Sequence, residues 1–171
     1  PYQTGNAVTD AIWSHGHRNP QGITYDPSGT VYSNEHGPKG GDEINLVMPG
    51  QNFGWPLVCQ CRDYSGAQVT PLKSASGMSD PLLHWLPSIA PSSILYYSGD
   101  SFPDWKGKLF NAALAGRHIR IVDPEQPDEQ ISILSELGLR WRDIAQGPDG
   151  HLYAAGEGGE SGGVIYRISP N

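Results

Sequence analysis

The chain lacks long apolar runs, basic runs and extended helical periodicity. No stretch approaches the ~20 apolar residues that cross a bilayer, so we expect no membrane span. Its 11 lysines and arginines are outnumbered by 18 aspartates and glutamates, and the formal net charge is -7. Such a surface attracts a phosphate backbone poorly, which argues against nucleic acid as the main partner. The best helical candidate, residues 130–137, is short, so strands and turns are expected to dominate.

Familiar catalytic signatures are also absent. The sequence contains no Gly-x-Gly-x-x-Gly, no Walker A loop, no His-Glu-x-x-His and no Gly-x-Ser-x-Gly elbow. The chain has two cysteines, Cys59 and Cys61. Their spacing disfavours a strain-free mutual disulfide, and it is not the C-x-x-C spacing of structural zinc sites. We therefore expect semi-buried side chains or reduced thiols, which say little about the redox compartment.

The sequence is instead rich in short strand-like runs that end at glycine and proline turns. Residues 23–32 and 144–153 share the pattern Ile-x-x-x-Pro-x-Gly-x-x-Tyr at an offset of 121. A weaker copy around Gly107 divides this offset into spacings of 78 and 43 residues. A period of about 40–50 residues is typical of β-propeller blades. The missing copy falls between residues 54 and 83, where we expect an elaborated loop. A β-sandwich, the competing fold, does not explain the period.

Two polar segments have the composition of binding loops. In residues 14–22, Arg18 and Asn19 precede a strand, where a guanidinium and an amide suit a planar anion. Residues 34–43 combine three glycines, a proline and three acids, and their carbonyl and carboxylate oxygens suit Ca²⁺. The alternatives are a polar turn in the first segment and an acidic turn before a strand in the second.

Arginines and a tryptophan supply two further candidates. Arg140 and Arg142 would share one face of an extended strand. Two guanidinium groups repel each other unless an anion or acid lies between them, which favours a carboxylate-bearing ligand over pairing with surface acids. Trp85 adjoins a proline-stiffened loop, where its ring either stacks on a sugar or flat cofactor or packs in the core.

Taken together, these segments resemble the soluble quinoprotein glucose/aldose sugar dehydrogenases, which use pyrroloquinoline quinone (PQQ). The matching segments are HGHRNPQG (15–22), NEHGPKGGDEIN (34–45), NFGWP (52–56), PSIAPSS (87–93), GKLF (107–110) and RWRD (140–143). The resemblance covers almost the whole chain and implies an all-β, six-bladed propeller. At about 40–45 residues per blade, the chain would form about four later blades, as a partial propeller over residues 1–171.

The resemblance also implies a set of site residues. The side chains assigned to PQQ are Arg18, Asn19, His36, Arg140 and Arg142, with Arg117 standing in for a lysine of the family. The carbonyls of Gly37 and Pro38 are assigned to Ca²⁺, and Trp85 is assigned to the border of the sugar site. A second, structural Ca²⁺ would use Asp63 and the backbone near Cys59 and Cys61.

The implied reaction is oxidation of an aldose at its anomeric hydroxyl. A general-base histidine would remove the hydroxyl proton while hydride passes to PQQ, and Ca²⁺ would stabilise the developing oxyanion. No histidine here has the context of the family's base, so we expect that base to lie outside this chain. The alternatives are a non-catalytic binding propeller and a Ca²⁺-dependent lactonase-like hydrolase.

The resemblance further implies a periplasmic or secreted protein. An open propeller would leave blade faces unpaired. We therefore expect upstream sequence, or a second copy of the chain, to close the ring.

Overall fold

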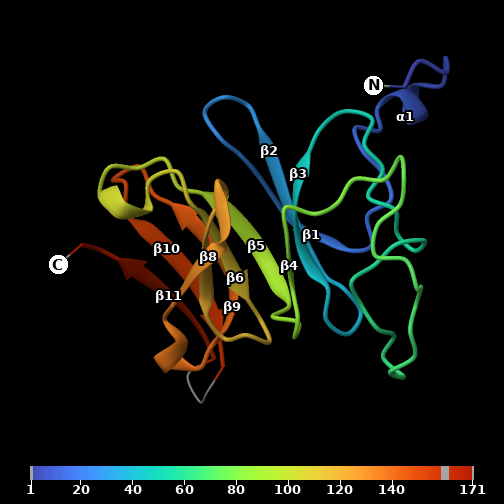
Figure 1. The fold of residues 1–171 in the computed structure, drawn as a ribbon. Helices are drawn as coiled ribbons and strands as arrows, with labels where there is room; N and C mark the ends of the chain where they lie inside the picture. Colours follow the sequence, from blue (N-terminus) through green and yellow to red (C-terminus); the bar gives the residue numbers. More distant parts are fainter. Residues whose placement is uncertain (1, 159–161, 171) are drawn as a thin grey trace.

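The computed structural model describes residues 2–158 and 162–170, and it arranges their strands in three antiparallel sheets (Figure 1). Helical structure in this part consists of a short helix α1 (Ala7–Asp10) and 3-10 turns at Pro103–Trp105 and Ser135–Leu137. No helix in the described ranges is long and apolar enough to cross a membrane. The predicted all-β class is confirmed.

Each sheet is built from strands that are consecutive along the chain. The first contains β1 (Pro20–Tyr25), β2 (Val31–Glu35), β3 (Asp42–Val47) and β4 (Leu83–Trp85). The second contains β5 (Pro91–Tyr96), β6 (Leu109–Ala113), β7 (Ile119–Asp123) and β8 (Gln126–Ile133). The third contains β9 (Arg140–Gln146), β10 (Leu152–Glu157) and β11 (Gly163–Ile168). These up-and-down sheets are the blades that the repeat predicts.

The first strands of neighbouring sheets lie side by side and run in the same direction. Near the start of β1, Gly22 lies so close to Ser93 of β5 that a Cβ would approach the Ser93 Cα to 2.9 Å. Near the end of β1, the Thr24 hydroxyl accepts a hydrogen bond of 3.0 Å from the Tyr96 amide. The contacts advance together along both strands, so β1 and β5 are parallel.

Strands β5 and β9 are related in the same way. The Ser92 hydroxyl donates to the Trp141 carbonyl at 2.7 Å near their starts. The Gln146 side chain, at the end of β9, accepts from the Ser98 amide at 3.0 Å, just beyond β5. The starts of β1, β5 and β9 therefore lie at one end of the stack, which we call the entry end.

Tight turns at the opposite end explain the sequence repeat. Gly29, Gly107 and Gly150 precede the second strand of each sheet, with φ of +89°, +86° and +78°. This left-handed region favours glycine, because glycine has no Cβ to clash with the backbone. The repeat therefore marks the same hairpin in three sheets.

Two apolar clusters fill the spaces between adjacent sheets. The cluster between the first and second sheets includes Tyr32, Ile44, Trp85, Ile94 and Leu109. The cluster between the second and third sheets includes Tyr97, Phe110, Ile121, Trp141 and Leu152. Burial of such side chains contributes about 1.5–3 kcal/mol each, so inter-sheet packing holds the blades together.

Residues 48–82, between β3 and β4, form the elaborated loop that the sequence predicts. In this stretch the structure shows isolated bridges rather than strands, pairing Asn52 with His15 and Arg62 with both Lys39 and Gln68. The three sheets and this long loop together fit the predicted extent of about four blades.

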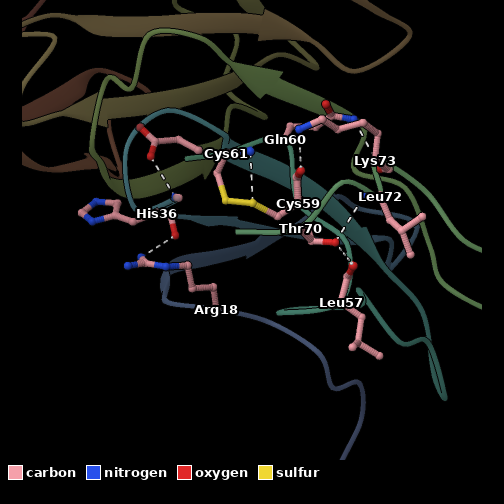
Figure 2. Close-up of a disulfide and its surroundings, with 11 residues drawn as sticks. Arg18, His36, Leu57, Cys59, Gln60, Cys61, Thr70, Leu72 and Lys73 are labelled. Carbon is pink, nitrogen blue, oxygen red and sulfur yellow. Dashed lines mark hydrogen bonds between the residues drawn. A yellow bond between two sulfur atoms is a disulfide. The ribbon is translucent and has the colours of Figure 1, made fainter. Parts of the chain in front are cut away.

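The loop also corrects the prediction for the cysteines. Cys59 and Cys61 form a disulfide (Figure 2). The chain turns at Gln60, so the two Cα atoms lie 5.2 Å apart, within the roughly 4.4–6.8 Å that disulfides usually span. The prediction of reduced thiols was wrong because it took the spacing as a barrier without considering a local turn.

Candidate functional site

A buried carboxylate fixes the backbone at the start of β1. Glu35, 3% exposed at the end of β2, accepts hydrogen bonds from the backbone amides of Arg18 (2.6 Å) and Asn19 (3.0 Å) through Oε2. Its Oε1 accepts from the Asn45 side chain at 2.8 Å and lies 3.1 Å from Nδ1 of His17. Charge-assisted bonds of this kind are strong, so Glu35 holds the Arg18–Asn19 backbone in place.

The Arg18 side chain is held from two directions. One guanidinium nitrogen donates to the His36 carbonyl at 2.9 Å, a bond drawn in Figure 2. The guanidinium carbon also lies 5.3 Å from the centre of the Trp55 ring, in cation–π range. The arginine is thereby oriented while other N–H groups of its guanidinium stay available to an anion.

A second buried carboxylate anchors the loop after β2. Asp42 is fully buried, and its Oδ1 accepts from the Gly37 amide at 3.0 Å. Its Oδ2 accepts from the Ser88 hydroxyl and from the amides of Ile89 (2.8 Å) and Ala90 (2.7 Å). Asp42 therefore ties the Gly37 loop to the segment that leads into β5.

The Gly37 loop is tightly folded. A Cβ at Gly37 would lie 2.1 Å from the carbonyl oxygen of Gly40, so only glycine fits here. Among the described residues, no hydrogen bond is formed to the carbonyl oxygens of Gly37 or Pro38. Free carbonyl oxygens are ligands that a hard cation such as Ca²⁺ accepts, so the donors at this loop fit the ion.

Arg18 and the Gly37 loop share one pocket. Its lining includes Arg18, His36 and both Gly37 and Pro38, with Trp55 and the Cys59–Cys61 disulfide also on its walls. Four of the residues predicted for cofactor and metal therefore meet in space, although they come from two separate segments. Whether each performs its predicted role stays a prediction.

An acid with an altered pKa also lines this pocket. Burial, and secondly the nearby charge of Glu35, raise the pKa of Glu43 to about 8. Desolvation penalises the charged carboxylate, and a neighbouring negative charge adds to that penalty. Glu43 is therefore largely protonated at neutral pH.

The two arginines at the start of β9 lie on one face, as predicted. Trp141 between them is fully buried, while both guanidinium groups are exposed. An acid lies between the guanidinium groups, because Glu157 Oε1 contacts Arg140 Nε at 3.1 Å and also contacts Arg142. Hydrogen bonds from Arg142 and then Arg140 lower the pKa of Glu157. In this conformation the two arginines therefore pair with a surface acid, which is the alternative to a carboxylate-bearing ligand.

Contacts through β5 connect these arginines to the pocket. The His36 ring donates from Nε2 to the Pro91 carbonyl at 2.6 Å, and the neighbouring Ser92 bonds to β9. Arg117 has φ +52° in the loop after β6, and it donates to the Gly138 carbonyl at 3.2 Å, just before β9. At the entry end, Arg18 and His36 therefore form a pocket group, and Arg117, Arg140 and Arg142 form a β9 group. Asn19 adjoins Arg18 but does not line the pocket, and its side-chain oxygen accepts from Gln21 at 3.0 Å.

Trp85 does not join either group. Its side chain is 6% exposed within the core between the first two sheets, and its indole N–H donates to Gln130 at 2.9 Å. Burial in the β4 strand favours the alternative of core packing over the sugar border, and the sugar-border assignment stays a prediction.

Asp63 lies in an exposed turn of the long loop. A hydrogen bond of 2.8 Å from the Ser65 amide lowers the pKa of its carboxyl. Across residues 2–158 and 162–170, no three His, Cys, Asp or Glu side chains are arranged to hold a metal. The second Ca²⁺ site stays a prediction.

Sequence reasoning missed several residues that build the site. Glu35 and Asp42 lie within the motif of residues 34–45, and Trp55 lies within the motif of residues 52–56. The motifs therefore drew attention to segments that the fold brings together in the pocket. They did not show that the two acids bond backbone amides or that Trp55 contacts Arg18, because those contacts join residues far apart in sequence.

Comparison with known proteins extends the sequence resemblance. The model of the glucose/sorbosone dehydrogenase family matches residues 1–167. The aldose sugar dehydrogenase YliI of Escherichia coli is 39% identical over 99% of this chain and 47% of its own length. Quinoprotein glucose dehydrogenase B of Acinetobacter calcoaceticus is 34% identical over 61% of this chain and 21% of its own length.

Solved structures give the same result. The apo form of the soluble aldose sugar dehydrogenase of E. coli matches with a TM-score of 0.83 at 39% identity, over 94% of this chain and 47% of that one. The PQQ-bound aldose sugar dehydrogenase of Streptomyces coelicolor matches with a TM-score of 0.70 at 25% identity, over 92% of this chain and 45% of that one. The chain thus spans less than half the length of these relatives.

Proposed function

Because this chain belongs to the glucose/sorbosone dehydrogenase family, we propose that it supplies the cofactor-binding part of a PQQ- and Ca²⁺-dependent aldose dehydrogenase. The observation that carries the proposal is the pocket whose lining brings Arg18 together with Gly37 and Pro38, residues whose carbonyl oxygens accept no hydrogen bond in the described part of the chain. A quinoprotein among the relatives and a PQQ-bound structure among the structural neighbours support it.

The donors present suit both groups. PQQ carries carboxylates, and Arg18 offers a guanidinium in the pocket that also contains Gly37 and Pro38, while Asn19 offers an amide just before the start of β1. When bound, PQQ accepts hydride from the anomeric carbon of an aldose while Ca²⁺ stabilises the developing negative charge on oxygen.

The chain's own residues supply orientation. Glu35 fixes the backbone of Arg18, while the His36 carbonyl and the Trp55 ring fix its side chain. Such preorganisation lowers the entropy that is lost when an anion binds. The Trp55 ring also covers one side of the guanidinium and reduces its hydration, which strengthens its attraction for a carboxylate.

The arginines of β9 would act as a second anion site. Glu157 now lies between Arg140 and Arg142. A ligand with several carboxylates carries more negative charge than this single acid, so it competes effectively for both guanidinium groups. Arg117 lies in a neighbouring loop at the same end and would add a third positive charge.

We propose that the general base comes from outside this chain. Both ring nitrogens of His17 are engaged, by the Ser14 hydroxyl at 2.8 Å and by Glu35 at 3.1 Å. His36 uses Nε2 to bond the Pro91 carbonyl. These contacts make His17 and His36 poor candidates, because a base needs a free nitrogen near the substrate hydroxyl.

The remaining blades and the location belong to the same proposal. Upstream sequence, or a second copy of the chain, would complete the propeller around the entry end. A periplasmic or secreted location follows from the resemblance. The disulfide supports it, because disulfides persist mainly in oxidising compartments.

Binding of PQQ in the presence of Ca²⁺ tests the proposal. We expect PQQ to quench tryptophan fluorescence, because Trp55 lines the pocket, and we expect Arg18→Ala to weaken binding at least 10-fold. Arg167→Ala is the matched control, because Arg167 is an exposed arginine that bonds Asp149 at 3.2 Å at the turn end. Equal affinity for both variants would contradict the site, and absence of saturable PQQ binding would contradict the function.

Activity is tested separately, on the complete gene product. We expect an aldose to reduce a redox dye only after PQQ and Ca²⁺ are added. A loaded protein that binds PQQ yet gives no dye reduction with a panel of aldoses would contradict the proposed substrate class.

A further inference from the structure

The Cys59–Cys61 disulfide is part of the pocket wall rather than a distant staple. Cys59 is 7% exposed and Cys61 is 3% exposed, and both line the pocket that contains Gly37 and Pro38. The resemblance that identifies the cofactor residues assigns no role to this bond.

The segment that contains the disulfide is paired directly with the Gly37 loop. Arg62 follows Cys61, and its amide donates to the Lys39 carbonyl at 3.3 Å, while the Lys39 amide donates to the Arg62 carbonyl at 3.0 Å. At Gly41, an added Cβ would come within 2.9 Å of the Cys61 Cβ. Cys61 therefore lies against the Gly37 loop, near Gly41.

The other half is fastened to a different part of the long loop. The Cys59 amide donates to the Leu72 carbonyl at 3.2 Å, and the Lys73 ammonium donates to the Cys59 carbonyl at 3.0 Å (Figure 2). Thr70 also bonds the Leu57 carbonyl at 2.7 Å. The disulfide thus joins Cys59, whose backbone is held by residues 70–73, to Cys61, whose neighbour Arg62 pairs with Lys39.

These contacts matter because little regular strand pairing holds this region in place. Residues 48–82 form isolated bridges instead of ladders in the described structure. Asp42 holds the Gly37 end of the loop, but its bonds do not reach Lys39. A covalent link at Cys61 limits the conformations of the neighbouring backbone where hydrogen bonds alone are sparse.

We infer that the Cys59–Cys61 disulfide is a positioning element that holds the Gly37–Pro38 carbonyls at their cation-binding geometry. The effect on a cation rests on the proposed function, whereas the effect on the loop does not. In the reduction step, a dithiol supplies two electrons and two protons. The S–S bond breaks, two cysteine thiols form, and the dithiol becomes a cyclic disulfide.

Hydrogen exchange without any cation tests the effect on the loop. The Lys39 amide bonds to Arg62 and the Gly41 amide bonds to Trp85 at 2.8 Å. We expect reduction by dithiothreitol to speed exchange of both amides at least 10-fold. Amides of β6 and β7 should keep their protection. Unchanged exchange at Lys39 and Gly41, or equal loss of protection in all three sheets, would overturn the inference.

The double variant Cys59→Ser/Cys61→Ser is the matched control. It should exchange at Lys39 and Gly41 as fast as the reduced protein, and it should not respond to dithiothreitol. Slow exchange in this variant, equal to that of the oxidised protein, would also refute a positioning role.

Calorimetric titration with Ca²⁺ alone then separates this inference from the proposed function. We expect at least 10-fold weaker Ca²⁺ binding in the reduced protein and in the double variant. Equal affinity in the oxidised and reduced states would overturn the positioning of the carbonyls. If Ca²⁺ binds neither state while loop exchange still responds to reduction, the loop inference stands and the proposed metal site fails.

Discussion

The buried Asp42 carboxylate offers a direct test of how the entry end is held together. It receives the amides of Gly37, Ile89 and Ala90 and the hydroxyl of Ser88, and it is 0% exposed. We expect the nearly isosteric change Asp42→Asn to destabilise the protein by about 3–5 kcal/mol.

The magnitude follows from the donors around the side chain. An asparagine has one acceptor oxygen, so if that oxygen faces Ile89 and Ala90, its NH₂ group faces the Gly37 amide. An unsatisfied buried donor costs about 1–3 kcal/mol. The bonds that remain lose their charge assistance, which costs about 1 kcal/mol for each of the two amides. The Ser88 hydroxyl rotates to suit either side chain and adds little.

Urea denaturation at pH 7 measures this loss. Most domains have a stability of about 5–15 kcal/mol, so the variant should still fold and give a measurable transition. Asp128→Asn is the control, because Asp128 is an exposed acid on β8, and it should change stability by no more than about 0.5 kcal/mol. A loss below about 1 kcal/mol for Asp42→Asn would refute the reasoning that Asp42 clamps the loop.

Three further predictions concern charge, packing and ligand binding. The folded-state pKa of Glu43, raised from 4.5 to about 8, means that its contribution to stability is complete below pH 4.5 and is lost as pH rises towards 8. Glu43→Gln should therefore stabilise the protein relative to wild type at pH 8 but not at pH 4.5. Urea denaturation in EDTA measures the difference, and an equal change in stability at the two pH values would exclude the raised pKa of Glu43. Gly22→Ala should cost several kcal/mol, because a Cβ there meets backbone of β5, whereas Gly163→Ala on β11 has room and should be neutral. A thermal melt compares the two variants, and similar melting temperatures would contradict the close packing of β1 against β5. Arg142→Ala should weaken PQQ binding at least 10-fold in a fluorescence titration, and an unchanged affinity would remove the β9 group from the site.

The strand pattern of this protein was readable because the turns repeat. The glycines at positions 29, 107 and 150 recur for a local reason, a left-handed turn, so they predict three hairpins and their strands. The repeat does not mark strands β4 and β8. Strand β4 has only three residues, and β8 contains the polar run Gln126–Gln130, so neither carries a strong pattern.

The candidate site was predictable only to the level of segments. Alternation placed Arg140 and Arg142 on one face, because that property depends only on strand geometry. The burial of Trp85 depends on its packing with distant residues such as Ile94 and Leu109 of the second sheet. The disulfide depends on a backbone turn at Gln60, which is held by hydrogen bonds from Cys59 to Leu72 and between Arg62 and Lys39. Neither property is contained in the local sequence.

The parallel arrangement of β1, β5 and β9 has a consequence for where the blades resemble one another. Each blade starts at the entry end and turns back at the opposite end, so every blade contributes residues to both ends. The turn end keeps its glycine in every sheet, since each hairpin has the same geometric need. At the entry end, position 18 is arginine while its counterpart at the offset of 121, position 139, is leucine. The repeat is therefore visible at the turn end and absent at the entry end, where the blades carry different residues.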